Sequence, residues 1–229
     1  MIISSIISIF SPTHSNGYIG FSLLKKKTSH PVAPTAKKIV GYKTVGLARG
    51  AKKKVFLASP TFTQSLNSVQ ATATCYQSSH GFKTNCTCGF YSFKKKERAF
   101  TYEGRTTGIV VETVLSGRYV EYSHGWRAEN QRVTEIIVDL CQDCKANPAQ
   151  AFALQWREDI VPVCLNDALD YAPSLTFTFE EIENRMDVPA NYKFDRPAVI
   201  SRYSTVPATR EQLDANKFRR LIQRIKDNW

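Results

Sequence analysis

Acidic residues are absent from the first 60 positions of the chain, which hold nine lysines and Arg49. Beyond residue 60 there are 21 basic and 20 acidic residues, so the net charge of +11 comes almost entirely from the acid-free part. This distribution is typical of a nearly neutral folded body behind a basic arm.

Long apolar runs, internal repeats and common catalytic motifs are also missing. No apolar run approaches the ~20 residues that a membrane-spanning helix needs, so we expect no integral membrane association. Residues 1–10 are apolar but lack a preceding basic region and are interrupted by serines, so we expect no secretory signal. The chain has no nucleophile motif, glycine-rich phosphate loop or paired metal-carboxylate motif, and an enzyme is therefore not favoured.

The residues that are present favour a β-rich core. The hydrophobic content of 42% is ample for one. Apolar and β-branched residues at 39–47, 55–58 and 69–75 predict a hairpin and a third strand. Residues 106–115 and 117–129 are predicted to pair as an antiparallel hairpin across a Ser-Gly turn.

Further elements are expected towards the C-terminus. Residues 133–140 predict another buried strand. Capping-box patterns at Thr178 and Thr209 predict two helices, the second of which is amphipathic. We expect that helix to pack through Phe218, Leu221, Ile222 and Ile225. An Asn-Pro pair at 147–148 favours a third helix or, alternatively, an excursion between metal ligands.

Six cysteines in a chain without a secretory signal point to a reducing compartment, the cytoplasm, where close cysteine pairs are more often metal ligands than disulfides. Cys141 and Cys144 form a C-x2-C pair, and Cys164 follows after nineteen residues. Asp167 occupies the position where a second C-x2-C pair would end, and carboxylates are admissible zinc ligands. We therefore predict a structural zinc site at Cys141, Cys144, Cys164 and Asp167, with Cys75, Cys86, Cys88, His80 and His124 as rivals for the fourth position. Ordinary buried reduced cysteines are the alternative.

His80, Cys86 and Cys88 form a second candidate cluster. A C-x-C pair strains simultaneous binding of one metal, although turn geometry can allow it. The alternatives are a tight turn leading into a strand at residues 90–93 or, in an oxidising compartment, a disulfide between neighbouring strands.

Residues 117–129 concentrate the groups that catalysis would need. A histidine beside carboxylates can act as a general base and an arginine can hold an anion, so a small hydrolase or lyase would use Glu121, His124, Arg127 and Glu129. A polar network that fixes the strand register explains the same residues, and we favour it.

Two motifs resemble a family of small uncharacterised proteins of actinobacteria and their phages. Residues 86–92 read CTCGFYS and residues 117–129 read GRYVEYSHGWRAE. The family typically has C-x-C-G-aromatic-aromatic-small, then G-R-hydrophobic-V-E-H-x-H-G-aromatic-R-A-E. The resemblance covers roughly residues 39–140 and implies no established activity. Tyr122 replaces a histidine that the family usually has, which weakens any two-histidine site.

The basic arm predicts salt-sensitive contact with nucleic-acid phosphates through Lys25, Lys26, Lys27, Lys52, Lys53 and Lys54. An arm that lies over neighbouring subunits, or a solvated tail, would have the same composition. We expect an α+β fold: a basic arm at 1–38, a mainly antiparallel β domain at 39–207 with a zinc segment at 141–167, and a helix at 208–229. The expected function is a non-enzymatic accessory protein of a bacterium or phage, in the cytoplasm or the virion, with virion assembly as the alternative.

Overall fold

The computed structural model describes residues 38–58, 66–75, 80–102, 107–155 and 158–227. The predictions for Lys25, Lys26, Lys27 and the rest of the arm lie outside these residues. No described helix is long and apolar enough to span a bilayer. The elements are β1 (Ile39–Thr44), β2 (Gly46–Arg49), η1 (Ala51–Lys53), β3 (Val55–Ala58), β4 (Leu66–Asn67), β5 (Gln70–Thr72), β6 (Phe90–Phe93), α1 (Lys96–Phe100), β7 (Ile109–Glu121), β8 (Gly125–Val138), β9 (Ala151–Leu154), β10 (Asp159–Val163), α2 (Leu165–Ala168), η3 (Pro173–Leu175), β11 (Thr176–Phe177), α3 (Phe179–Arg185), β12 (Ala198–Ser201) and α4 (Arg210–Asp227).

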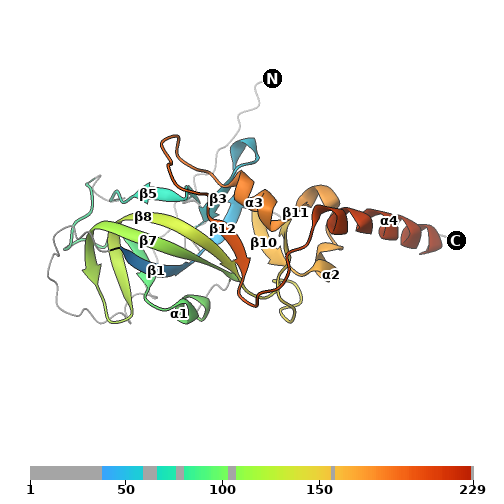
Figure 1. Ribbon diagram of the computed structural model, residues 1–229, viewed down its shortest axis with the longest axis horizontal. Coiled ribbons are helices and arrows are strands. Elements are labelled where there is room, and N and C mark those ends of the chain that lie inside the picture. Colours follow the sequence, from blue (N-terminus) through green and yellow to red (C-terminus); the bar gives the residue numbers. More distant parts are fainter. Residues whose placement is uncertain (1–37, 59–65, 76–79, 103–106, 156–157, 228–229) are drawn as a thin grey trace, which may run out of the picture.

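The long hairpin of β7 and β8 organises the first sheet (Figure 1). Strand β8 also pairs with β6, β5 and β12 along its length, and only the β12 pairing is parallel. Strand β1 pairs with both β6 and β7, so β7, β8, β6 and β1 form a closed ring of pairings. This closure leaves few unpaired backbone groups around the hairpin.

The second sheet has the order β11-β9-β10-β2-β3-β4, and its pairings are antiparallel. Val45 is the only residue between β1 and β2, so the chain passes from one sheet to the other there. Val45 is buried, and its backbone N–H donates to the carbonyl of Ile109. The fold is thus α+β with mainly antiparallel sheets, as the sequence predicts.

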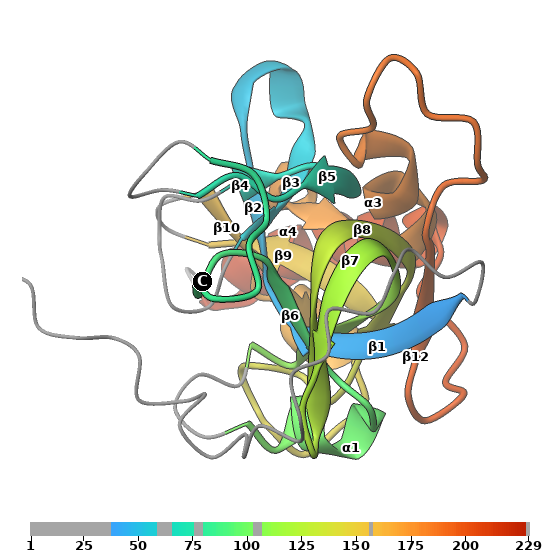
Figure 2. The ribbon, with the colours of Figure 1, turned by 90° about the vertical axis from the view of Figure 1, so that its left-hand side faces the viewer.

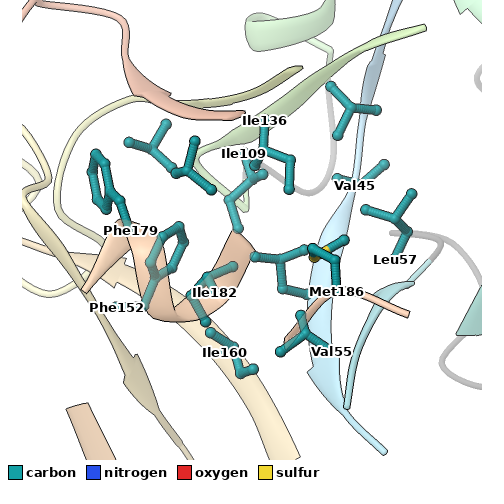
Figure 3. Packing of buried hydrophobic residues seen from close by; sticks show 14 of the residues in the cluster. Val45, Val55, Leu57, Ile109, Ile136, Phe152, Ile160, Phe179, Ile182 and Met186 are labelled. Carbon is teal, nitrogen blue, oxygen red and sulfur yellow. The ribbon is translucent and has the colours of Figure 1, made fainter. Parts of the chain in front are cut away.

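The main core lies where the two sheets and helix α3 meet (Figure 3). Phe152 on β9 and Phe179 on α3 pack with their ring centroids 5.4 Å apart. The apolar side chains of Ile109 and Ile136 enter the same cluster from the first sheet. Burial of this shared apolar surface joins the sheets.

The hairpin differs from its prediction in the position of its turn. Strand β7 continues through Gly117, which has φ +76°, and the register with β8 shifts between Ser116 and Tyr119. Gly117 therefore makes a bulge, a conformation that glycine adopts without steric cost, and the turn lies at residues 122–124 instead. The strand predicted at 133–140 is the end of the same long β8.

The helix predicted after the Asn-Pro pair at 147–148 is wrong. Residues 151–154 form β9, whose four residues are all buried between β10 and β11. Local helix signals are weak compared with the burial of a whole segment between two strands. The segment does lie between Cys144 and Cys164, two residues of a group that could hold a metal ion.

Both predicted capping boxes are confirmed. Thr178 and Glu181 exchange hydrogen bonds at the start of α3, and Thr209 and Gln212 do so at α4. Helix α4 extends away from the body (Figure 1), and Leu213 near its start is buried. The expected packing is wrong for Ile222 and Ile225, whose exposed fractions are 47% and 52%. The side chains of Phe218 and Leu221 lie outside the described part of the chain.

Candidate metal centres

Among the described residues, two groups of four side chains could each hold a metal ion. One consists of Cys141, Cys144, Cys164 and Asp167, and the other of Cys75, His80, Cys86 and Cys88. Within each group, one ligand atom per residue lies within 4.8 Å of the others. Four protein ligands rich in thiolate suit a tetrahedral metal with no open position, which is typical of a structural site.

The first cluster joins the loop after β8 to the start of α2. The Cys144 and Cys164 sulfurs are 4.0 Å apart, and an Oδ2 atom of Asp167 lies 2.9 Å from the Cys141 sulfur. A tetrahedral zinc with bonds to sulfur of about 2.3 Å has sulfur–sulfur edges of about 3.8 Å. The sulfur spacing therefore fits a zinc-sized ion, whereas a disulfide needs about 2.05 Å.

The backbone around Cys141 and Cys144 supports a metal-binding turn. The N–H of Lys145 donates to the carbonyl of Cys141, and Lys145 has φ +53° in the left-handed region. The N–H groups of Ala146 and Asn147 donate to the Cys144 sulfur and lower the pKa of this thiol. These donors favour the thiolate, which is the form that binds a metal.

Cys141 and Asp167 of the first cluster shift each other's pKa. Burial, with a hydrogen bond to Asp167, raises the pKa of the Cys141 thiol to about 12. Hydrogen bonds from the thiols, led by Cys141, lower the pKa of Asp167. Burial and the Asp167 carboxylate thus both oppose ionisation of the Cys141 thiol. A divalent cation would overcome both effects, because coordinating thiols are deprotonated outright.

The second cluster lies beside the first sheet. Cys75 and His80 flank a short bridge in which Thr74 pairs with Gly81, and the Cys75 N–H donates to the His80 carbonyl. The Cys75 and Cys86 sulfurs are 3.7 Å apart, close to the tetrahedral edge. All six cysteines are free thiols in the structure, so the disulfide interpretation is not supported.

The ligands of the second cluster have supporting hydrogen bonds. The Nδ1–H of His80 donates to the Gly81 carbonyl at 2.5 Å, which leaves Nε2 to bind a metal. Metal-binding histidines usually have such a second hydrogen bond. The Cys88 N–H donates to the Cys86 sulfur and is the main reason that the pKa of Cys86 falls to about 7.

Sequence reasoning placed Cys75 among the rivals for the first site and did not assign it to the second cluster. The only signal available was its place at the end of a predicted strand, because no C-x2-C spacing includes it. His124 belongs to neither described cluster; it lies in the turn between β7 and β8.

The residues of the catalytic hypothesis have separate partners. Glu121 pairs with Lys94 at 2.6 Å, and Glu129 pairs with Arg118 at 2.7 Å, which lowers the pKa of Glu129. Arg127 donates to backbone carbonyls. No hydrogen bond within the described ranges joins His124 to either carboxylate. The arrangement therefore resembles the polar network that fixes strand register.

The described lysines of the nucleic-acid hypothesis lie on the loop of the β2–β3 hairpin, which projects at the top of Figure 2. Lys52 and Lys53 are exposed, with φ of +57° and +59°. Lys54 pairs with Asp187 at 2.6 Å, and Arg49 in the adjoining strand pairs with Glu158. The loop therefore has its free charge at Lys52 and Lys53, which have no ion pair among the described residues.

Comparison of the chain with models of protein families, with curated protein sequences and with solved structures gave no match. The resemblance of residues 39–140 to the actinobacterial and phage family stays an expectation from sequence. The function is therefore inferred from the chemistry of the two clusters and of the charged surface.

Proposed function

We propose that this protein is a non-enzymatic accessory protein that contacts nucleic acid through basic segments on a zinc-stabilised β body. The observation that carries the proposal is the projecting loop of the β2–β3 hairpin, where Lys52 and Lys53 are exposed and free of ion pairs within the described part of the chain. Such cations favour binding to phosphates, because each phosphate that a lysine neutralises releases condensed counterions into solution.

The first cluster supplies the zinc of this proposal. Its three cysteines select a soft metal, and Asp167 would complete the tetrahedron. Small buried residues surround Cys141 and Cys164, and Ala208 and Leu213 at the base of α4 pack into the same group. A metal there would hold the loop after β8, helix α2 and the base of α4 together, which is a structural role.

The hairpin is tested by replacing Lys52 and Lys53 with asparagine. Asparagine tolerates positive φ, so the double variant removes two charges and keeps the loop conformation. We expect weaker binding of a fluorescent DNA or RNA duplex, with the slope of log K against log salt less steep by about two. Fluorescence anisotropy over a salt series measures both quantities.

The matched control is Lys95→Gln with Lys96→Gln, which removes two exposed lysines at the start of α1. We expect this control to bind nearly as well as the wild type. Equal losses in both double variants would show general charge attraction and overturn the assignment to the hairpin. Absence of wild-type binding at low salt would overturn nucleic-acid contact altogether.

A second candidate, a structural protein of an assembly such as a virion, is favoured by helix α4. Ile222 and Ile225 are exposed on a helix that extends beyond the body (Figure 1), and exposed apolar stripes suit protein partners. A stable oligomer in light scattering that dissociates in the Ile222→Glu, Ile225→Glu variant, or on deletion of residues 1–37, would support this role. A monomer at every concentration would contradict it.

A further inference from the structure

Arg127 is the largest fully buried side chain described, and only 1% of its surface is exposed. It lies on β8, next to Trp126, and its guanidinium donates to the loop at residues 83–88. An arginine stays charged under all ordinary conditions. Burying such a charge without a counter-charge is costly, so an anion nearby would stabilise this arrangement.

The hydrogen bonds of Arg127 use four of its five N–H groups but do not balance its charge. Nη1 donates to the carbonyls of Lys83 and Cys88, Nη2 donates to the carbonyl of Thr84 at 2.9 Å, and Nε donates to the hydroxyl of Tyr122 at 3.2 Å. The guanidinium also lies 4.8 Å from the ring centroid of Phe82. Every one of these partners is neutral, and no carboxylate pairs with Arg127 among the described residues.

The loop that Arg127 binds contains two ligands of the second cluster, Cys86 and Cys88. We propose that Cys75, His80, Cys86 and Cys88 bind a second zinc ion and that Arg127 is the buried counter-charge of this centre. Three thiolates and a neutral imidazole around a divalent zinc have a net charge of about −1. The positive charge of the guanidinium and the negative charge of the metal centre then neutralise each other.

The backbone that follows Cys88 also packs closely against Arg127. Gly89 has φ +130°, and a Cβ atom there would lie 2.9 Å from Cγ of Arg127 and 2.9 Å from the Phe82 ring. The chain after Cys88 thus passes directly over the buried arginine. Arg127 is therefore a positioning residue, since it fixes the carbonyl-lined turn from which Cys86 and Cys88 reach the metal.

Metal content of the full chain, purified without chelator, tests the site. We expect one zinc for each of the two clusters in the wild type by mass spectrometry. Cys86→Ser with Cys88→Ser should remove one of them, and Cys141→Ser with Cys144→Ser should remove the other. If the Cys141→Ser, Cys144→Ser variant contains no zinc at all, the second site is overturned. A Cys75–Cys86 disulfide in the intact mass would overturn it as well.

The role of Arg127 is tested by cobalt and zinc titration of the chelator-treated chain. Arg127→Met keeps the buried stem without the charge, and we expect the affinity of the second site to fall about 10–100-fold. Arg127→Lys should recover most of that loss, because it restores the charge without the guanidinium fork. Arg132→Met is the control, since Arg132 lies on the same strand and its guanidinium is 4.0 Å from the Phe194 ring.

Equal affinity in Arg127→Lys and Arg127→Met would overturn the counter-charge role. If Arg127→Met does not fold, the Cys86→Ser, Cys88→Ser variant and Arg127→Lys still decide the site. The inference goes beyond nucleic-acid contact. Zinc content and affinity report on it separately, whatever the hairpin lysines do.

Discussion

Single residues determine how closely the loop of the second cluster approaches the sheet. Gly89 and Gly81 both belong to this loop, yet they differ in their surroundings. Gly89 has φ +130° and lies against Arg127, whereas the nearest atom to a Cβ at Gly81 is 4.0 Å away. A side chain would therefore clash at Gly89 but not at Gly81.

We therefore expect Gly89→Ala to lower the free energy of unfolding by about 1–3 kcal/mol, because a strained backbone and a close contact coincide there. Gly81→Ala should change it by less than about 0.5 kcal/mol. Urea unfolding of both variants measures the difference. Equal stability of the two variants would contradict the packing described for Arg127.

Lys43 on β1 predicts a stability that depends on pH. Burial lowers the pKa of this lysine from its ordinary value of 10.5 to about 8. The unfolded state therefore binds more protons than the folded state between about pH 8 and pH 10.5, and stability rises with pH through this window.

Replacing Lys43 with methionine should remove this dependence. We expect Lys43→Met to be more stable than the wild type by about 1–2 kcal/mol near neutral pH, where the wild type keeps a charged lysine in a half-buried position. The difference should shrink towards zero by about pH 10.5. Urea unfolding along a pH series measures it, and Lys95→Met, at an exposed position, should show no such trend.

At the scale of elements, the capping box of α3 links local sequence to the main core. Thr178 accepts a hydrogen bond from the Glu181 N–H, and the Glu181 carboxylate accepts one from the Thr178 N–H. Glu181 also pairs with Arg210 at the start of α4. The box thus connects two helices as well as starting one.

Thr178→Ala should lower the free energy of unfolding by about 1 kcal/mol, because it leaves a helix N–H without its acceptor. Thermal or urea unfolding measures this, and Thr72→Ala, at an exposed position, is the control. If Thr178→Ala is as stable as the control, α3 does not depend on its cap.

For the whole molecule, metal binding would hold together segments that are distant in sequence. The first cluster joins the loop after β8 to α2 and to the base of α4, and the second joins the segments around Cys75 and Cys86 to β8. The first region has a small core apart from the main one, and no described core group includes the ligands of the second cluster. The stability of both regions is therefore expected to depend on the ion more than the stability of the core around Phe152 does.

Removal of zinc should lower the melting temperature. At free zinc a thousand times the dissociation constant, each site would add about 4 kcal/mol, which corresponds to roughly 10 °C for a chain of this size. Scanning fluorimetry with and without chelator measures the shift. Zinc, but not magnesium, should reverse it, since thiolates disfavour magnesium. An unchanged melting temperature would contradict metal binding at both clusters.

The sequence by itself determined the elements whose causes are local. The α+β class follows from β-branched segments and two capped helices, and the C-x2-C pair with Cys164 and Asp167 identified the first cluster by spacing. The tertiary structure decided what depends on distant contacts. It made residues 151–154 a buried strand, moved the hairpin turn from Gly117 to residues 122–124, and brought Cys75 to His80, Cys86 and Cys88. Only the folded chain shows Arg127 as a buried cation on the cysteine loop, because burial and charge balance are properties of packing.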